Sequence, residues 1–456
     1  MSPTTADAVP PSRPSPAAPE LWPAPRAAGP LDAVVAVPGS KSLTNRYLVV
    51  AALAERPSLL RAPLLSRDTS LMAQGLRALG ARITAGGDPG AEALEAGDWL
   101  VHPGPVTGGG RVDCGLAGTV MRFLPPVAAL AERPVEFDGD PRARERPMGA
   151  VLDGLRQLGA VVEDGGRGLL PFSVRGPEGG LRGGSVRIDA SGSSQFVSAL
   201  LLVGARCRDG LEVVHEGPEL PSAPHVRMTV EVLRDAGVVV DDAVPGRWAV
   251  EPGEVNALDV HVEPDLSNAG PFLAAAAVAG GRVRVPGWPQ ATTQAGDLLR
   301  DVLDQMGADV ALERDGLVVR GTGELYGLDL DLREAGELAP VITALAALAS
   351  TPTRLRGVAH LRGHETDRLK ALVTEVNALG GDAEETSDGL LLRPRPLHGG
   401  VFRTYADHRM ATAAAVIGLA VDGVLVEDVA TTGKTLPDFP GMWAAMLAGP
   451  GAVAGR

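Results

Sequence analysis

The sequence predicts an α/β protein of two domains, each built from three repeats of about 75 residues. Five segments share one pattern, a helical end followed by a glycine and a short extended run: 76–83, 155–162, 233–240, 303–310 and, more weakly, 376–383. Their glycines are 79, 78, 70 and 73 residues apart, a regularity that chance rarely produces. The chain length of 456 residues is also typical of two or three domains.

Each shared glycine marks the expected end of a helix. In "LRALGARI" and "LRQLGAVV", Gly80 and Gly159 separate a helical pattern from a run suited to a strand. A helix that stops at a glycine just beyond its C-terminus explains this local pattern. The same reading applies to Gly237, Gly307 and Gly380. A repeat of this length has room for about two helices and three or four strands, and residues 443–453 resemble a sixth, truncated copy.

Six copies group most simply as three plus three. The composition changes over residues 241–265, after the third copy, so we place the passage between domains there. The strand expected at 33–39 precedes the first copy and could belong to either half. The first thirty residues contain nine prolines and no apolar core of a signal peptide, which predicts a disordered extension.

The composition excludes several classes of partner. A net charge of -14 argues against nucleic acid or an anionic membrane as the main partner. No apolar stretch reaches the ~20 residues of a membrane span. Cys114 and Cys207 are too few for a disulfide framework and lack metal-ligand spacing, which fits a reducing cytoplasm.

Lysine is almost absent from the chain. The 42 basic residues include three lysines, Lys41, Lys370 and Lys434, and therefore 39 arginines. A lysine that remains could provide what arginine cannot, a compact ammonium whose pKa can be tuned. The alternative explanation for any single lysine is that it has remained in the sequence by chance. Lys41 and Lys434 lie inside motifs, whereas Lys370 is typical of a solvated helix.

The segment "VPGSKSLTNR" (37–46) suggests an anion site at the start of a helix. It lacks both glycines of a nucleotide-binding P-loop, so that interpretation fails. The remaining features still suit an anion. Gly39 allows a turn and Ser42 offers a capping hydroxyl, while Lys41 and Arg46 provide two positive charges. An ordinary capped helix is the competing explanation for this segment alone.

Further segments combine cations with small or hydroxyl residues where loops meet helices. They are "LAGTVMRFL" (116–124), "DPRARERPMG" (140–149), "ASGSSQF" (190–196), "RGHETDRL" (362–369), "YADHRMATAAAV" (405–416) and "TTGKTLPDFP" (431–440). Each alone is more often structural. Together they place at least five cations in such settings on an acidic protein, which indicates one or two ligands rich in phosphate and carboxylate.

In this order, seven segments resemble the signature of the EPSP synthase (3-phosphoshikimate 1-carboxyvinyltransferase) family. They are "PGSKSLTNR", "AGTVMR", "PRARERPM", "SGSSQF", "HETDRL", "DHRMA" and "GKTLPDFP", and the match spans roughly residues 33 to 440. The resemblance implies two α/β domains, each an inside-out α/β barrel of three βαβαββ units, joined by two crossover strands. Domain one would comprise 30–39 plus 263–456, domain two 40–262, and residues 1–29 would be the extension.

The resemblance also implies an activity. The enolpyruvyl group of phosphoenolpyruvate would be transferred to the 5-hydroxyl of shikimate 3-phosphate, releasing phosphate through addition, a tetrahedral intermediate and elimination. This is a step of the shikimate pathway toward chorismate and the aromatic amino acids, in the family that glyphosate targets. No metal or organic cofactor is implied. The expected partners are small molecules only, and we expect a monomer whose domains close on the ligands.

The resemblance assigns site residues by matched position. The expected catalytic residues are Glu337, Lys41 and Glu365, with Glu337 acting on the hydroxyl. The residues expected to bind shikimate 3-phosphate are Lys41, Ser42, Arg46, Ser193, Ser194, Gln195, Ser222, Glu337 and His364. Those expected to bind phosphoenolpyruvate are Lys41, Gly118, Arg142, Gln195, Arg368, Arg409 and Lys434.

Several positions depart from the family pattern. Glu337 stands where aspartate is more common, and His364 stands where lysine is usual. The other departures are Leu116 for asparagine, His225 for tyrosine and Phe123 for proline, and the last leaves glyphosate sensitivity open.

Two rival hypotheses remain. The related UDP-N-acetylglucosamine enolpyruvyl transferases share the repeats but usually carry an active-site cysteine, and Cys114 lies near that region. The second rival hypothesis is a repeat protein without catalytic activity, in which the basic loops form ion pairs at the surface.

Overall fold

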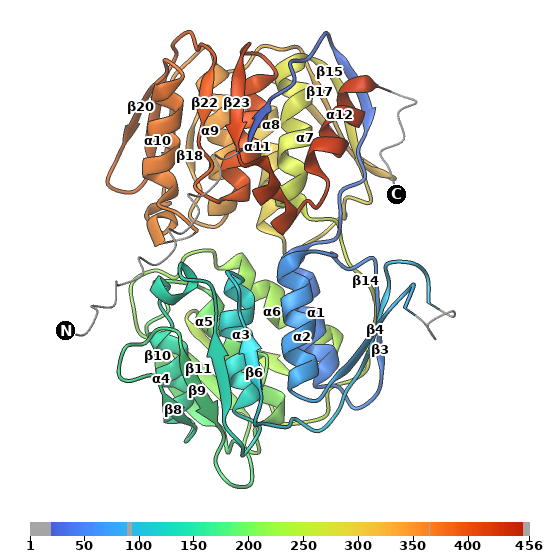
Figure 1. The fold of residues 1–456 in the computed structure, drawn as a ribbon, viewed down its shortest axis with the longest axis vertical. Coiled ribbons are helices and arrows are strands. Elements are labelled where there is room, and N and C mark those ends of the chain that lie inside the picture. Colours follow the sequence, from blue (N-terminus) through green and yellow to red (C-terminus); the bar gives the residue numbers. More distant parts are fainter. Residues whose placement is uncertain (1–19, 89–93, 364, 450–456) are drawn as a thin grey trace, which may run out of the picture.

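The computed structural model describes residues 20–88, 94–363 and 365–449, which form two domains stacked along the long axis of the molecule (Figure 1). Within these residues the strands form six sheets, three in each domain. No helix in this part of the chain has the length and apolar character needed to cross a bilayer. The outcome agrees with the predicted class, α/β with two domains of three repeats.

Domain two, the lower one in Figure 1, contains three units with the same order of elements. The first comprises β14 (Asp259–His261), α1 (Lys41–Ala52), β3 (Ser58–Arg61), α2 (Arg67–Ala78), β4 (Arg82–Ala85) and β5 (Trp99–His102). The second comprises β6 (Arg111–Asp113), α3 (Gly118–Ala128), β7 (Val135–Asp138), α4 (Gly149–Gln157), β8 (Val161–Glu163) and β9 (Phe172–Arg175). The third comprises β10 (Gly184–Ile188), α5 (Gln195–Leu201), β11 (Leu211–His215), α6 (Pro224–Asp235), β12 (Val240–Asp241) and β13 (Arg247–Val250).

Domain one repeats the same order. Its first unit comprises β2 (Leu31–Val34), α7 (Leu266–Ala279), β15 (Gly281–Pro286), α8 (Leu299–Gln305), β16 (Asp309–Glu313) and β17 (Gly316–Gly321). The second comprises β18 (Asp329–Asp331), α9 (Ala339–Leu348), β19 (Thr353–Arg356), α10 (Arg368–Ala378), β20 (Asp382–Glu385) and β21 (Leu390–Arg393). The third comprises β22 (Gly400–Phe402), α11 (His408–Gly418), β23 (Val424–Glu427), α12 (Phe439–Ala448) and β1 (Leu21–Pro23).

Each complete unit makes a sheet in which the first two strands are parallel and the others are antiparallel. In the third unit of domain two, β10 runs parallel to β11, which pairs with β13 in the opposite direction. The parallel pair requires a crossover helix, whereas the last two strands are joined by a short connection. The order βαβαββ therefore follows from the pairing, as the resemblance implied.

The predicted helix ends are confirmed at all five shared glycines. Gly80, Gly159, Gly237, Gly307 and Gly380 have φ between 75° and 114°, a backbone conformation that disfavours other residues. After α2, the N–H of Ala81 reaches back to the carbonyl of Leu76 at 3.0 Å, which closes the helix. The same bond recurs after α4, α6, α8 and α10. The period in the sequence is therefore the period of the fold.

The first helix of each unit is central. In domain one, α7, α9 and α11 contact one another, and their sequences are rich in alanine, leucine and valine on every side. Most of their residues are buried, including Phe272 of α7 at 0% exposure. A helix that is apolar all round belongs inside a core. With helices inside and sheets around them, each domain has the inside-out arrangement that the resemblance implied.

The chain passes between the domains twice, and each passage donates a strand. β2 pairs with β15 in domain one before α1 begins in domain two, whereas β14 pairs with β3 in domain two before α7 begins in domain one. The two passages touch at a bridge between Gly39 and Pro264. At Gly39 a Cβ would lie 2.4 Å from the carbonyl oxygen of Ala62, so the crossing needs glycine. Domain boundaries near residues 39 and 263 remain our proposal.

The expected disorder of residues 1–29 is wrong for residues 20–29. β1 pairs antiparallel with β23 and takes the place of the missing last strand of the sixth unit. The ring of Trp22 meets the edge of Phe439 with centroids 6.2 Å apart. Proline density suggested disorder, but a short strand at a sheet edge accepts Pro23 at its end. Residues 1–19 lie outside the described part of the chain.

We expect Trp22→Ala to destabilise domain one, because it removes the aromatic contact that fastens β1. The expected loss is about 2 kcal/mol of unfolding free energy, less than for a fully buried tryptophan. Leu21→Ala is the control, since Leu21 is 43% exposed on the same strand. Urea unfolding measures both. Equal stability of the two variants would contradict a fastening role for Trp22.

Candidate active site

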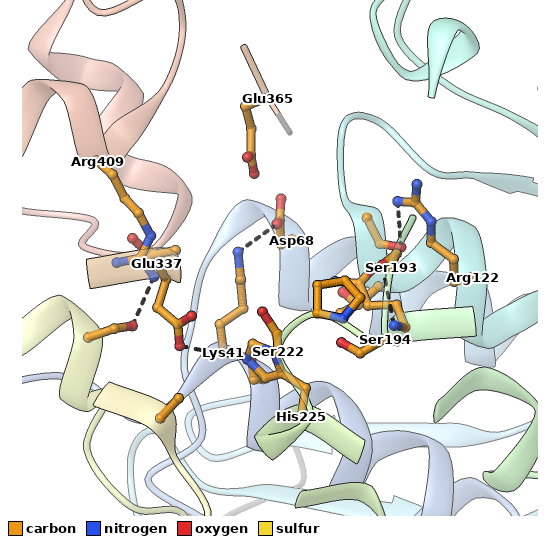
Figure 2. A pocket seen from close by; sticks show the side chains of 18 of the residues that line it. Lys41, Asp68, Arg122, Ser193, Ser194, Ser222, His225, Glu337, Glu365 and Arg409 are labelled. Atoms are coloured by element: carbon orange, nitrogen blue, oxygen red, sulfur yellow. Dashed lines mark hydrogen bonds and ion pairs between the residues drawn. The ribbon is translucent and has the colours of Figure 1, made fainter. Parts of the chain in front are cut away.

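A pocket between the two domains collects most of the predicted site residues. Its described lining includes Lys41, Ser42, Arg46, Gly118, Ser193, Ser194, Gln195 and Ser222 from domain two, and Glu337, Glu365, Arg368, Arg409 and Lys434 from domain one. Figure 2 shows labelled side chains of both domains turned toward one space. Residues that are up to about 390 positions apart in the sequence therefore meet, as the anion-site hypothesis required.

The central helices of both domains direct their N-termini at this pocket. α1, α3 and α5 begin there with Lys41, Gly118 and Gln195, and α7 and α11 begin beside it with Asp265 and His408. Glu337 lies in the turn just before α9. Helix N-termini carry unpaired N–H groups and partial positive charge, so they favour anions.

The side chains add further positive charge. Among the described lining residues there are seven cations, Lys41, Arg46, Arg122, Arg146, Arg368, Arg409 and Lys434. They face four carboxylates, Asp68, Asp265, Glu337 and Glu365. A cationic pocket on a chain with net charge -14 is a strong local exception. It suits a substrate or substrates with several negative charges.

Lys41 is held at the first position of α1. The N-cap Ser40 accepts a hydrogen bond from the N–H of Leu43, and the N–H of Lys41 donates to Asp265 at 3.2 Å. The Lys41 ammonium lies 3.5 Å from Asp68. Burial lowers the pKa of Lys41 below its ordinary value, and Lys434 and Arg409 act in the same direction although Asp68 opposes them. The ammonium is therefore more acidic than a surface lysine.

Arg46 is a buried cation without an acidic partner in the described chain. It is 1% exposed and donates to the hydroxyl of Thr229 at 2.8 Å and to the carbonyls of Ser42 and His225 at 2.9 Å. Phe123 lies beneath it, 5.2 Å from the guanidinium to the ring centroid. The phenylalanine that departs from the family pattern thus supports a site cation.

Hydroxyl groups line the opposite wall. Ser193 and Ser194 precede α5, and the Oγ of Ser193 accepts from the N–H of Gln195 at 3.3 Å. The carbonyl oxygen of the Gln195 side chain is buried and has no hydrogen-bond partner. Ser222 has φ of 51°, a conformation that is rare for serine, and its N–H donates to the carbonyl of Arg333 in the other domain. Such strain clusters at functional sites.

A network of ion pairs organises the wall from domain one. Arg368 is 2.7 Å from Asp407 and 3.1 Å from Glu365, and Lys434 donates to Glu365 at 2.6 Å. Burial alone would raise the pKa of Glu365, but Lys434 and Arg368 outweigh it and hold the pKa well below its usual range. Glu365 is thus an anion in this state and a poor proton donor.

Glu337 stands between the two domains. Its Oε1 is 3.8 Å from Nε2 of His225, too far for a direct hydrogen bond but close enough for a shared hydroxyl or water. Burial lowers the pKa of His225, although Glu337 opposes this, so the ring is neutral near pH 7. Arg409, which donates to Ser267 at 2.8 Å, lies on the other side of Glu337 (Figure 2).

Comparison with known proteins identifies the family of the chain. The EPSP synthase (3-phosphoshikimate 1-carboxyvinyltransferase) family model matches residues 25–443. The chain belongs to the EPSP synthase family. A relative from Kocuria rhizophila, named 3-phosphoshikimate 1-carboxyvinyltransferase, is 60% identical over 435 residues, which is 95% of this chain and 98% of that one.

Solved structures of the EPSP synthase family share the fold. Two structures of EPSP synthase from Acinetobacter baumannii superpose with TM-scores of 0.76 and 0.74. Each is 23% identical in sequence, and the match covers 91% of this chain and 96% of the other. The fold is therefore the one that the resemblance implied.

Not every residue expected from the EPSP synthase family lines the pocket. The Arg142 side chain is 53% exposed, pairs with Glu145, and donates to the backbone carbonyl of Glu365 across the domain gap at 3.4 Å. It lies beside the pocket rather than in its wall. Arg144 points away and pairs with Asp138. His364 lies outside the described residues, so its expected role stays a prediction.

Other residues that line the pocket were not singled out from the sequence. Arg122 and Arg146 line the pocket, although each sits inside a quoted motif. Asp68, which pairs with Lys41, lies in none of the quoted motifs. It stands in the first turn of α2, two residues after the N-cap Ser66, in a pattern common to many helices. Its spacing from Lys41 in the sequence gives no signal. Only the packing of α1 against α2 brings the two together.

Cys114 does not behave as the reactive cysteine of the rival enolpyruvyl transferases. It is fully buried, and burial raises the pKa of its thiol to about 12. A thiol of this kind is inert at neutral pH. Leu116, at the position where asparagine is common, contributes its carbonyl oxygen to Arg146 at 3.3 Å. The burial of Cys114 thus gives no support to the rival enolpyruvyl transferase.

We expect acid to destabilise the ligand-free enzyme through His408. Burial, then Arg409 and Lys434, hold the pKa of His408 well below its usual range, and both ring nitrogens lack hydrogen bonds. Between the folded and unfolded pKa values the unfolded chain binds the extra proton, so stability rises with pH. Above about pH 6.5, His408 is neutral in both states and costs no stability. As the pH falls below that value, the free energy of unfolding decreases by about 1.4 kcal/mol per pH unit because of this one group.

Urea unfolding between pH 7 and pH 5 measures this slope. His408→Asn should reduce it by one proton equivalent. His225 and His360, whose pKa values burial also lowers, retain a slope of the same sign in the variant. An unchanged slope in His408→Asn would show that His408 is not the group that titrates.

Proposed function

We infer that this protein is a 3-phosphoshikimate 1-carboxyvinyltransferase. It transfers the enolpyruvyl group of phosphoenolpyruvate to the 5-hydroxyl of shikimate 3-phosphate and releases phosphate. The observation that carries the inference is the 60% identity to a relative of that name over 95% of the chain. The cationic pocket supports it, because both substrates carry a phosphate and a carboxylate.

The pocket offsets the repulsion between two substrates of like charge. Two like charges 4 Å apart repel by ~1 kcal/mol in water and by several-fold more in a drier site. We propose that Ser193, Ser194 and Ser222 bind the 3-phosphate, with Lys41, Ser42 and Arg46 beside the ring. Gln195, with its unpartnered buried oxygen, would contact both substrates.

Phosphoenolpyruvate would lie nearer domain one. We propose that Lys41, Gly118, Arg368, Arg409 and Lys434 hold it, since planar guanidinium groups match carboxylate and phosphate. Arg142 would join them from the mouth of the pocket. Holding both substrates in one orientation also removes most of the entropy barrier to their reaction.

The reaction is an addition followed by an elimination. Glu337 accepts the proton of the 5-hydroxyl as that oxygen bonds to C2 of phosphoenolpyruvate, and an acid protonates the methylene carbon. In the tetrahedral intermediate this carbon then loses a proton while the C2–O bond to phosphate breaks. The lowered pKa of Lys41 and the paired, anionic state of Glu365 favour Lys41 as that acid.

We also propose that the enzyme acts as a monomer in the cytoplasm. Both domains of one copy contribute residues to the described lining of the pocket, as expected of a site that forms within a single chain. Cys114 and Cys207 are buried free thiols, as expected in a reducing compartment.

Phosphate release tests the function. Folded protein mixed with shikimate 3-phosphate and phosphoenolpyruvate should release phosphate, and omission of either substrate should abolish the release. UDP-N-acetylglucosamine in place of shikimate 3-phosphate should give none. No release with both substrates from protein that melts cooperatively would exclude the function, and release with the nucleotide sugar would favour the rival enzyme.

A further inference from the structure

A buried carboxylate on α10 holds the loop that leads into α11. Glu375 is 0% exposed. Its Oε2 accepts a hydrogen bond from the N–H of Arg403 at 2.9 Å, and its Oε1 accepts one from the hydroxyl of Tyr405 at 2.5 Å. Both donors belong to the loop between β22 and α11. A carboxylate that has left water needs such donors, and these two are neutral groups.

The loop that Glu375 holds has an unusual backbone. Tyr405 and Ala406 are consecutive residues with φ of 55° and 56°, a conformation that side chains disfavour and that the surrounding structure must enforce. In domain two, the turn between β6 and α3 occupies the same place in its unit, and there Gly115 has φ of 49°. The loop before α11 thus keeps a tyrosine where a glycine would relieve the strain.

Packing in the core does not account for this tyrosine. The Tyr405 side chain is 40% exposed, so it buries little apolar area for its size. Partial burial, followed by the hydrogen bond to Glu375, raises the pKa of the Tyr405 hydroxyl to about 12, so the group remains a donor at neutral pH. The contact between the hydroxyl and the carboxylate explains the place of the side chain better than its ring does.

The loop ends at Asp407, which orders two cations of the pocket. Asp407 is 0% exposed and caps α11 by accepting from the N–H of Arg409 at 2.9 Å. The same carboxylate accepts from Nε of Arg368 at 2.7 Å and from its Nη2 at 3.2 Å. Arg368 and Arg409 both line the pocket. A displacement of the loop would therefore move the anchor of both cations together.

α10 fastens the loop at two points. Arg368 is its first residue and Glu375 lies two turns later, so both buried side chains project from one face of the helix. Arg368 binds the Asp407 end of the loop, and Glu375 binds the end at Arg403. With both ends and the Tyr405 hydroxyl held by one rigid helix, the strained segment has a single path into α11.

We propose that Glu375 is a positioning residue for the phosphoenolpyruvate side of the pocket. It fastens the strained loop so that Asp407 presents Arg368 and Arg409 in one fixed geometry. The proposal rests on the proposed function, in which these two arginines bind phosphoenolpyruvate. Glu375 is not among the described residues that line the pocket, so it acts through the loop rather than on the substrate.

Steady-state kinetics test the proposal with Glu375→Leu, which fills the space but cannot accept a hydrogen bond. The KM for phosphoenolpyruvate should rise about 10-fold or more, because the loop is released, while the KM for shikimate 3-phosphate should change less than about 2-fold. Glu375→Gln should stay within about 3-fold of wild type, since an amide can accept from Arg403 and donate to the Tyr405 oxygen. Thr374→Ala, at the exposed neighbouring position, is the matched control and should behave as wild type.

Tyr405→Phe tests the same contact at an exposed side chain, where loss of folding is not expected. Removal of this one hydrogen bond should raise the KM for phosphoenolpyruvate about 3-fold. In the Glu375→Leu background the same change should have no further effect, because the partner has already gone. Equal effects of Tyr405→Phe in both backgrounds would show that the two residues act independently and would overturn the proposal.

Hydrogen exchange provides a readout that does not depend on turnover. In the ligand-free proteins, the amides of residues 403–411 should exchange at least about 10-fold faster in Glu375→Leu than in wild type. The amides of α7 and α9 should keep their wild-type rates. Faster exchange throughout domain one would identify a general structural role and overturn the proposal.

The kinetic results are equally distinct. A normal KM for phosphoenolpyruvate in Glu375→Leu, or an equal rise in the KM for both substrates, would overturn the proposal. Absence of turnover in the wild type would instead refute the proposed function, while the exchange experiment would still decide whether Glu375 fastens the loop.

Discussion

Glu337→Gln is expected to lower kcat by about 10³-fold, or about 4 kcal/mol of barrier, with little change in either KM. The amide keeps the size of the side chain but cannot accept the hydroxyl proton. Because Glu337 lies between His225 and Arg409 at the domain gap, the loss should appear in the chemical step rather than in binding.

Phosphate release under saturating substrates measures this effect. Glu334→Gln is the control, because Glu334 is half-exposed on the same loop and pairs with Arg227 at 3.6 Å. Its kcat should stay within about 2-fold of wild type. Turnover of Glu337→Gln within about 10-fold of wild type would remove Glu337 from the role of base.

Lys41→Arg is expected to lose about 10²-fold or more in kcat while the protein folds normally. The substitution preserves the charge but replaces a compact, tunable ammonium with a guanidinium that stays protonated. It also enlarges the group in a place where Asp68 already fixes the ammonium at 3.5 Å. A purely electrostatic role would be largely rescued by arginine, so the conservative change discriminates between charge and acidity.

The control for this experiment is Lys370→Arg. Lys370 is exposed on α10 and is not among the residues that line the pocket, so arginine should serve equally there. Melting temperatures within about 2 °C for all three proteins would exclude misfolding as the cause. Near-normal turnover of Lys41→Arg would refute the hypothesis that a tunable ammonium explains why this lysine persists.

The sequence predicted the fold because the repeat has a local cause. Gly80 and its four counterparts end helices for reasons that lie within a few residues, so their spacing can be read without any tertiary contact. The strand at residues 21–23 could not be predicted in this way. Its partner β23 lies about 400 residues later, and only that distant sheet edge makes a proline-rich segment extended.

The site was predicted in part for a related reason. Residues at helix starts, such as Lys41, Gly118 and Gln195, carry motif signals because the turn itself constrains them. Asp68 lies in no motif, and Arg146 lies in a motif that does not tell its three arginines apart, since burial and neighbours decide their orientation. Within one loop, Arg144 and Arg146 look alike in the sequence, yet the first pairs with Asp138 and the second turns into the pocket.

The exchange of strands between domains has a consequence for synthesis on the ribosome. The strands β1 and β2 are synthesised first, but their partners are synthesised much later. β2 pairs with β15, which follows domain two in the sequence, and β1 pairs with β23, which lies near the end of the chain. Domain two lacks β14 until residue 261 emerges, and β1 waits for residues 424–427. Nascent chains are therefore expected to carry unpaired strand edges for most of translation, and unpaired edges favour aggregation.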